Sequence, residues 1–380
     1  MFRLIPVFIA SFFLSLNFGA TLYVNSVFLG QFFPSFVVSL LFLLGAVLNI
    51  ILFMLSPKLL NELGKEKLLF ITILITALST LALSTAWSSA VAIPFLLYSS
   101  TIFIVYYLID IFVEEGSQDA FTGEIRGVYG TVMNGGIAFG PIFSSILGAE
   151  SDLRPIYALG ASLLVVPLFL SVYLISKKSS WQKRRHEPIA LPFLIWWKKE
   201  NIRAVSIAKF VLETFFGLLI IYTPIYLHDV LGFGWGELGV IFSVSLLPFI
   251  LLEWPAGELA DRFWGEKEMM STGFFIMGVA LLIMPYLDKS FIAWILVLPL
   301  SRIGASLVEI TTESYFFKKI RAEDTGILSI FRLLRPAGVI SGAVIGALSL
   351  SLFPFQAIFL VLAVIVFWGL WESLYLRDTL

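Results

Sequence analysis

Residues 257–267, GELADRFWGEK, form a short charged stretch with two glycines between two long apolar runs. A weaker copy, PKLLNELGKEK, occupies residues 57–67, which is 200 residues earlier. Each stretch follows the second apolar run of its half of the chain and precedes the third. Two equivalent polar turns at this spacing predict a duplicated chain whose halves meet around one site.

The composition of the 380-residue chain indicates a lipid bilayer as its solvent. Hydrophobic residues make up 59% of the sequence and charged residues only 13%. So few charges cannot cover the surface of a water-soluble protein of this length. The formal net charge of −1 provides no generally basic surface for nucleic acid. We therefore predict a membrane protein with no nucleic-acid partner.

Sequence patterns that carry catalysis or bind metals are missing. The chain has no cysteine and only two histidines, His186 and His228, which argues against thiolate or histidine-built metal centres. It also contains no HExxH, GxSxG, P-loop or paired GxGxxG pattern. We predict that the protein is not an enzyme and that it uses no metal and no cofactor.

Twelve apolar windows predict membrane-spanning helices, since a bilayer core about 30 Å thick requires roughly 20 apolar residues per helix. Backbone groups facing lipid must bond within their own segment, and the alternation expected of barrel strands is absent. The expected fold class is an all-α integral membrane protein. The windows are residues 5–27, 34–55, 68–87, 90–113, 127–149, 155–176, 204–228, 236–256, 269–287, 290–316, 326–349 and 355–375.

The distribution of basic residues predicts the orientation of these spans. If the N-terminus, the even-to-odd loops and the C-terminus are cytoplasmic, 19 of the 25 lysines and arginines face the cytoplasm. Only Arg154 and Lys289 then face the opposite side, and four lie within spans. This positive-inside bias predicts a multi-pass protein of the plasma or inner membrane with both termini in the cytoplasm.

One long connection, residues 177–203, separates two six-span halves at residues 1–176 and 204–380. It is rich in lysine and arginine, and residues 189–197 add an apolar, aromatic run. We interpret it as a cytoplasmic linker whose interfacial helix faces anionic headgroups.

The two halves align with one another, which indicates an internal duplication. Four matches occur in the same order at offsets between 198 and 201 residues, giving two pseudo-symmetric six-helix bundles. In parallel repeats of this kind the site lies near the bilayer midplane between the halves. The matches are Phe18-Gly19 with Phe216-Gly217, Gly64 with Gly265, Asp110 and Glu114 with Glu309 and Glu313, and Gly127 with Gly326.

Two stretches resemble motifs of the major facilitator superfamily. Residues 257–262 are similar to the start of its loop motif, G-x-L-A-D-R-x-G-R-K, but Trp264 adds one residue before Gly265. Residues 136–145, GIAFGPIFSS, are similar to the GxxxGPxxGG signature of proton antiporters in that family, with serines replacing the last two glycines. The resemblance implies two six-helix halves, alternating access and, from the second motif, proton antiport.

The physical roles expected of these motifs differ. Asp261 and Arg262 lie in a cytoplasmic turn, where they either latch neighbouring helix ends together or form a solvated turn. Small residues at every fourth position let two helices approach closely, and a proline bends a helix. The residues expected to pack helices in this way are Gly136, Gly140, Pro141, Gly338 and Gly342.

Ionisable residues inside spans are the sharpest pointers to a site, because a charge in hydrocarbon costs about 2.5–3.5 kcal/mol on insertion scales. Steps of seven and four residues place Arg302, Glu309 and Glu313 on one face of their span. Arg302 lies near mid-membrane, about 18 Å along the helix from the start of the span. Lys209 and Glu213 form an i,i+4 pair on the first span of the second half.

Two interpretations of these charges compete. In the functional one, Arg302 contacts the substrate and Glu309 or Glu213 exchanges protons. In the structural one, charges near the cytoplasm form gate salt bridges, and Lys209–Glu213 fits either view. The gate pairs considered are Glu309 and Glu313 with Arg332 and Arg335, and Asp110 and Glu114 with Arg126 or Lys318. We expect gating for Asp110, Glu114, Glu313, Arg332 and Arg335, and substrate contact for Arg302.

Uncharged polar residues within spans complete the set of candidates, because hydrogen-bonding groups fix the orientation of a ligand in a cavity. They are Asn17, Tyr23, Asn25, Asn134 and Tyr222.

Together these features predict a monomeric secondary transporter that exports a small organic solute in exchange for protons. Uptake of a polar or anionic metabolite, by symport or uniport, is the alternative that Arg302 favours. A receptor or scaffold of the same fold without transport activity is an alternative of a different class.

Overall fold

The computed structural model describes residues 4–86, 88–116, 122–148, 152–176, 191, 193–252, 255–256, 259–260, 264–320 and 325–376. Within these ranges the chain forms helices and no strand, which confirms the all-α fold class. Eleven of the helices in the described ranges are long and apolar enough to cross a membrane. The eighth expected span is a shorter apolar helix, Trp235–Leu251.

The chain divides into two compact units, Met1–Pro188 with Gly234–Ser243, and Ile189–Phe233 with Val244–Leu380. The division groups the residues that follow Pro188 with the second unit and takes the start of one later helix into the first unit. The helices before Pro188 are α1 (Ile5–Leu22), α2 (Asn25–Gly30), α3 (Ser35–Leu63), α4 (Lys65–Ser84), η2 (Ser89–Val91), α5 (Ala92–Gly116), α6 (Thr122–Leu147), α7 (Arg154–Leu163) and α8 (Val165–Ser176).

The helices after Ile189 begin with a short one of six residues. They are α9 (Phe193–Lys198), α10 (Glu200–Ile225), η4 (Tyr226–Val230), α11 (Trp235–Leu251), α13 (Glu266–Ile283), η6 (Met284–Tyr286), α14 (Phe291–Lys319), α15 (Thr325–Leu352) and α16 (Ala357–Leu374).

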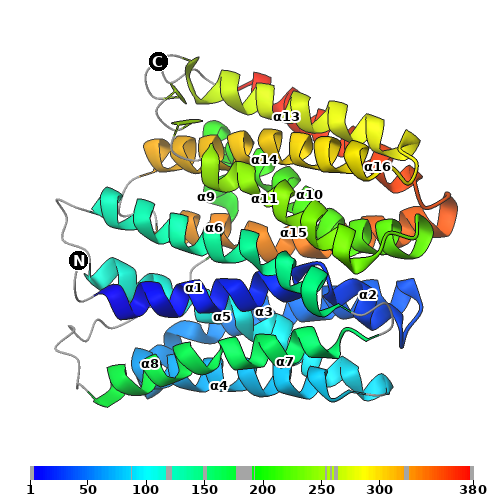
Figure 1. Ribbon diagram of the computed structural model, residues 1–380. Helices are drawn as coiled ribbons and strands as arrows, with labels where there is room; N and C mark the ends of the chain where they lie inside the picture. The colour runs from blue at the N-terminus through cyan, green and yellow to red at the C-terminus, as the bar shows by residue number, and fades with distance from the viewer. Residues whose placement is uncertain are drawn as a thin grey trace. The chain divides into compact units, whose positions relative to one another are not determined.

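Each unit packs its helices in the same pattern, as the internal duplication predicts. In the first unit α1 lies along α6, and α4 packs against α5 and α7. In the second unit α10 lies along α15, and α13 packs against α14 and α16 (Figure 1). These helices hold corresponding places in the two halves of the sequence. Equivalent neighbours therefore meet in both units.

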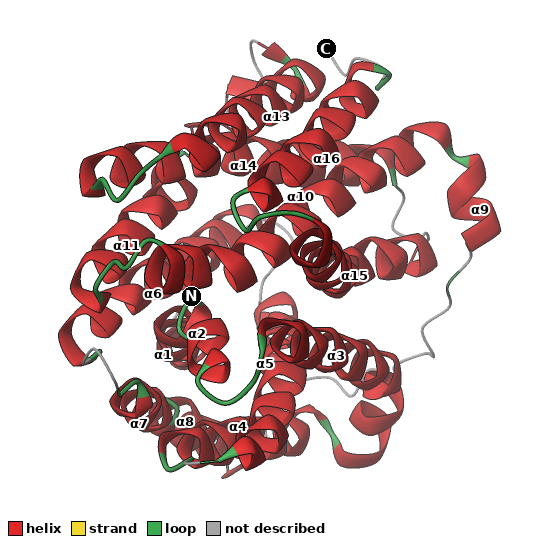
Figure 2. Cartoon of the chain, turned by 90° about the vertical axis from the view of Figure 1, so that its right-hand side faces the viewer, coloured by secondary structure: helices red, strands yellow, loops and turns green. Residues whose placement is uncertain are grey.

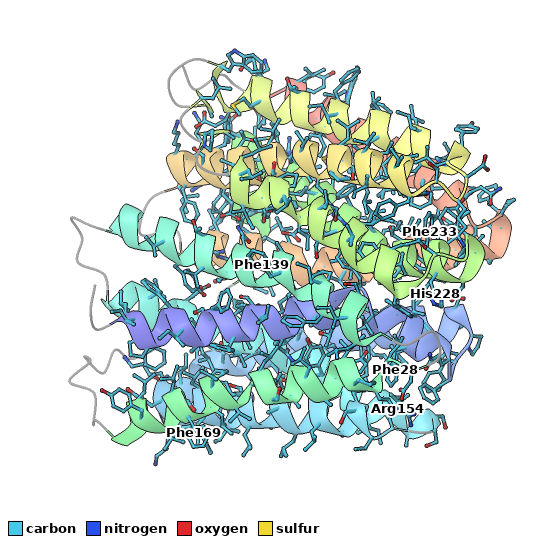
Figure 3. The ribbon with its side chains drawn as sticks, in the orientation of Figure 1. Phe28, Phe139, Arg154, Phe169, His228 and Phe233 are labelled. Carbon is cyan, nitrogen blue, oxygen red and sulfur yellow. The ribbon has the colours of Figure 1, made fainter. Side chains whose placement is uncertain are left out.

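The sixth expected span is divided into α7 and α8 at Leu164. Pro167 lies in the first turn of α8, where its ring occupies the space that the carbonyl of residue 163 would need in a continuous helix. At the other end of α7, Arg154 donates to Asp152 Oδ1 from Nε at 2.7 Å. The Arg154 guanidinium, labelled in Figure 3, holds the pKa of the Asp152 carboxyl below its usual value.

Large apolar side chains cover the outside of the helices. Phe169 on α8 is 70% exposed and Phe139 on α6 is 53% exposed, and both are labelled in Figure 3. Exposed rings on helices this apolar match a lipid environment, since hydrocarbon exacts no penalty for them.

Candidate functional site

A buried lysine of α10 lies among three carboxylates from two helices of the second unit. Lys209 Nζ is 3.3 Å from Glu213 Oε1, one turn further along α10. From α14, Glu313 Oε1 lies 3.2 Å from the same nitrogen and Glu309 Oε1 lies 3.8 Å from it. We call Lys209, Glu213, Glu309 and Glu313 the shared-lysine cluster. The i,i+4 spacing places Lys209 and Glu213 on one face of α10, and Glu309 and Glu313 on one face of α14. These two faces lie where α10 and α14 pack against each other.

Exposure differs within the shared-lysine cluster. The Lys209 and Glu213 side chains are each 6% exposed, whereas those of Glu309 and Glu313 are 37% and 31% exposed. The cluster therefore has an interior part on α10 and a partly accessible part on α14. Charges in such a place must be paired, because desolvation of a lone charge costs several kcal/mol.

Two arginines of α15 add positive charge near the cluster. Arg335 interacts electrostatically with Lys209, Glu309 and Glu313, and Arg332 interacts with Glu313. Both arginines are exposed. Together with these two arginines, the shared-lysine cluster has three cations and three carboxylates, so its charges balance when every carboxylate is ionised.

The backbone of α15 approaches the cluster closely at Gly338. A Cβ atom on this glycine would lie 2.4 Å from Glu213 Cβ and 2.5 Å from its carbonyl carbon. Only a residue without a side chain allows α15 to pack at this distance from α10. Gly338 consequently sets how near the arginines of α15 come to the carboxylates.

Arg302 lies two turns before Glu309 on α14 and is 1% exposed. Its guanidinium carbon is 5.2 Å from the centroid of the Phe215 ring and 5.5 Å from that of Phe216, both on α10. A guanidinium over aromatic faces gains cation–π attraction, which grows when water is excluded. In this conformation Arg302 therefore joins α14 to α10 and is not open to solvent.

The uncharged candidates occupy separate places. Tyr222 is fully buried and donates its hydroxyl to the Ala343 carbonyl on α15 at 3.0 Å. Asn17 and Tyr23 are buried in the first unit, where the Tyr23 ring stacks on Phe242 at a centroid distance of 4.0 Å. Asn134 is half-buried on α6.

The sequence of the chain is similar to those of known transport proteins. A sequence profile of the Major Facilitator Superfamily matches residues 205–379. The multidrug resistance protein MdtG of Escherichia coli O9:H4 (strain HS) is 26% identical over 265 residues, which cover 64% of this chain and 62% of MdtG. The multidrug resistance protein MdtH of Photorhabdus laumondii is 29% identical over 164 residues, 42% of this chain and 40% of MdtH. The chain thus spans less than two thirds of the length of these relatives.

Solved structures share the fold over nearly the whole chain. A peptide transporter, POT, superposes with a TM-score of 0.76 at 13% identity, covering 98% of this chain and 93% of its own. The nucleoside transporter NupG superposes with a TM-score of 0.74 at 16% identity, covering 99% and 100%. The second half of the chain is therefore similar in sequence to the Major Facilitator Superfamily, and the whole chain shares the fold of these transporters. The predicted resemblance to the major facilitator superfamily is confirmed.

The stretch that resembles the superfamily loop motif lies only partly within the described residues. Asp261, Arg262 and the side chains of Glu114 and Arg126 lie outside the described residues. Asp110 is exposed on α5. Lys318, considered above as a partner of Asp110 or Glu114, forms an ion pair with Glu266 at the start of α13.

Glu266 is a buried, ion-paired residue that the sequence alone did not single out. It is fully buried at the first position of α13, where Ser314 of α14 donates to its Oε1 at 2.9 Å. It takes the place of the arginine that follows the glycine in the superfamily loop motif. The ion pair with Lys318 therefore connects the loop motif to the end of α14, with an acid where the family pattern has a base.

The antiporter-like stretch, residues 136–145, packs α6 against α1. A Cβ atom on Gly136 would lie 2.7 Å from the Phe12 carbonyl oxygen, and one on Gly140 would lie 2.2 Å from the Gly19 carbonyl carbon. In the second unit, a Cβ atom on Gly342 would lie 2.6 Å from the backbone nitrogen of Leu218. Both helix pairs thus meet through close backbone contact.

Polar side chains form a second buried group in the first unit. The hydroxyls of Thr21 and Tyr98 are 2.7 Å apart, and Tyr157 donates to Asn25 Oδ1 at 2.8 Å. Polar residues at positions 17, 21 and 25 recur every fourth residue, a signal that places them on one side of the first span. Their partners on α5 and α7 could not be identified from that spacing.

Proposed function

We propose that this major facilitator is a secondary transporter that exports small organic solutes in exchange for protons, with the shared-lysine cluster as its coupling site. The observation that carries the proposal is one buried ammonium group shared by three carboxylates on two helices. Two relatives of the chain, MdtG and MdtH, are multidrug resistance proteins, and this supports export as the direction. The antiporter-like stretch at residues 136–145 supports exchange for protons.

Proton binding changes the balance of this cluster by one charge. Glu309 is the carboxylate that we assign to proton exchange, because it is the farthest from Lys209 Nζ and the most exposed. When Glu309 is protonated, Lys209 is shared by Glu213 and Glu313 alone, and the electrostatic attraction between α10 and α14 changes. A ligand or proton that binds two conformations unequally shifts their populations, which is the requirement for alternating access.

The alternative of anionic-metabolite uptake relied on Arg302 as the substrate contact. Its guanidinium is enclosed by Phe215 and Phe216, and this arrangement favours a role in joining α14 to α10. We therefore place export first. Arg302 remains the residue to examine if an anionic substrate is found.

Gradient-driven transport in proteoliposomes tests the proposal. Purified protein is reconstituted with a pH gradient, and uptake of a panel of fluorescent organic dyes is followed for the wild type and for Glu309→Gln. We expect accumulation to fall by about tenfold in the variant, within the usual range of coupling free energies. Exchange of the dye in the absence of a gradient should persist, since the solute path is intact.

Glu268→Gln is the matched control, because Glu268 is an exposed acid of α13 outside the cluster. Its accumulation should equal that of the wild type. Unchanged gradient-driven accumulation in Glu309→Gln would remove Glu309 from coupling. Dye-dependent stabilisation of the protein without any flux would favour the receptor over the transporter.

A further inference from the structure

The short helix α9 exposes several large apolar side chains, and basic residues lie directly beside them. Its six residues read FLIWWK. Leu194 is 81% exposed, and Phe193, Ile195 and Trp197 are each more than half exposed. Lys198 at its end is exposed as well. Such a surface gains free energy when lipid or another apolar partner covers it.

Specific contacts hold α9 against α10. Trp196 Nε1 donates to Ser206 Oγ on α10 at 3.0 Å. Arg203 of α10 donates to the Trp197 carbonyl oxygen at 2.9 Å, and its guanidinium lies 5.2 Å from the Trp197 ring centroid. Figure 2 shows α9 joined to α10 beside α15. The apolar surface is therefore presented by an anchored element.

The position of α9 along the chain places it at a bilayer surface. Only Lys199 separates it from α10, which has 26 residues and belongs to a candidate membrane span. At 1.5 Å per residue α10 is about 39 Å long, more than the roughly 30 Å of hydrocarbon. The start of α10, with Lys199 and Arg203, thus reaches the headgroup region, and α9 lies there too.

We propose that α9 and the start of α10 form a binding surface for anionic phospholipids. The apolar side chains of Phe193, Leu194, Ile195 and Trp197 would enter the interface, while Lys198, Lys199 and Arg203 would bind the headgroup phosphate. This combination of exposed rings and adjacent cations matches the two parts of a phospholipid. The surface is separate from the shared-lysine cluster and does not depend on the proposed transport.

The positive charge of this surface favours an anionic phospholipid over two other partners, the linker of the same chain and a second copy of the chain. Residues 177–192 carry five lysines and arginines but only one acid, so this part of the linker would bring positive charge to a positive surface. A second copy of the chain would bring the same basic residues. Like charges at such a contact repel, whereas an anionic membrane surface attracts each of them.

Lipid affinity tests the recognition of the headgroup. The full-length protein in neutral detergent is titrated with phosphatidylglycerol or phosphatidylcholine, and bound lipid is counted by native mass spectrometry. Because each basic residue contributes about fivefold to binding an anionic surface, Lys198→Gln/Lys199→Gln should lower phosphatidylglycerol affinity roughly twenty-fold. The control Lys58→Gln/Lys67→Gln removes two exposed lysines elsewhere and should change it little. Equal affinity for both lipids in the wild type would overturn the proposal.

The insertion of α9 has its own readout, because the chain has no cysteine. A fluorophore on Leu194→Cys should be quenched by lipids that carry a spin label near the headgroup. We expect stronger quenching in vesicles that contain phosphatidylglycerol, and this difference should disappear with Lys198→Gln/Lys199→Gln. A label that stays in water in both vesicles would overturn the insertion of α9 into lipid.

Discussion

At the scale of single residues, Lys209 is a charged group held almost entirely away from solvent. Its side chain is 6% exposed, and three carboxylate oxygens lie within 3.8 Å of its nitrogen. Lys58 offers a direct contrast, because it also pairs with a glutamate four residues later. There the distance is 3.9 Å, and the two side chains are 74% and 58% exposed.

Lys209→Met should lower the free energy of unfolding by about 3–5 kcal/mol, because it leaves buried carboxylates without their cation. Lys58→Met should change it by less than about 1 kcal/mol, since an exposed ion pair contributes little. Thermal unfolding of the protein in lipid nanodiscs measures both. The double variant Lys209→Met/Glu213→Gln should recover part of the loss. Equal shifts for Lys209→Met and Lys58→Met would contradict a tightly coupled cluster.

At the scale of elements, glycines set the distance between paired helices. On α6 the contrast lies within one helix, because a Cβ atom on Gly140 would clash with the Gly19 backbone while one on Gly135 would meet nothing within 4 Å. Backbone atoms cannot move aside as a flexible side chain can. Contact of this kind is how helices associate in lipid, where no hydrophobic force drives them together.

Gly140→Ala should lower the stability of the protein by about 1–3 kcal/mol, the usual cost of overpacking a tight contact. Gly135→Ala should be neutral or stabilising by up to about 1 kcal/mol, because alanine favours helix more than glycine does. Thermal midpoints of the two variants in the same nanodiscs provide the comparison. A harmless Gly140→Ala would mean that α1 and α6 are not held at this distance.

At the scale of the whole molecule, two features describe the chain as a membrane protein. One is the helix packing that both units repeat, and the other is the uneven distribution of lysine and arginine between the two sides of the membrane. The packing of α1 with α6 recurs as that of α10 with α15. The orientation of the bundle in the membrane follows from the lysine and arginine distribution and stays a prediction.

Single-cysteine labelling in intact cells tests that orientation, and the cysteine-free sequence makes every introduced thiol unique. A membrane-impermeant maleimide should label Asp288→Cys, which the charge distribution places outside, and leave Glu62→Cys unlabelled. Both positions are exposed, so both should react after permeabilisation. Labelling of Glu62→Cys in intact cells would reverse the predicted topology.

Much of this fold was predictable from the sequence for a physical reason. Lipid provides no hydrogen-bond partners, so a long apolar run has to be a helix, and hydropathy locates it. The duplication was visible because equivalent charges and glycines recur at nearly one offset. The division of the sixth span at Leu164 was not anticipated, although Pro167 supplies its cause.

Part of the candidate site was predictable from helical periodicity, whereas the contacts between its helices were not. Helical periodicity placed Lys209 with Glu213, and Glu309 with Glu313, each pair on one face of its own helix. That Lys209 is shared by all three carboxylates, and that Arg302 packs on the rings of α10, depends on how α10 and α14 are rotated against each other. A periodic pattern has no information about that rotation, because it is set by the packing of side chains from distant parts of the chain.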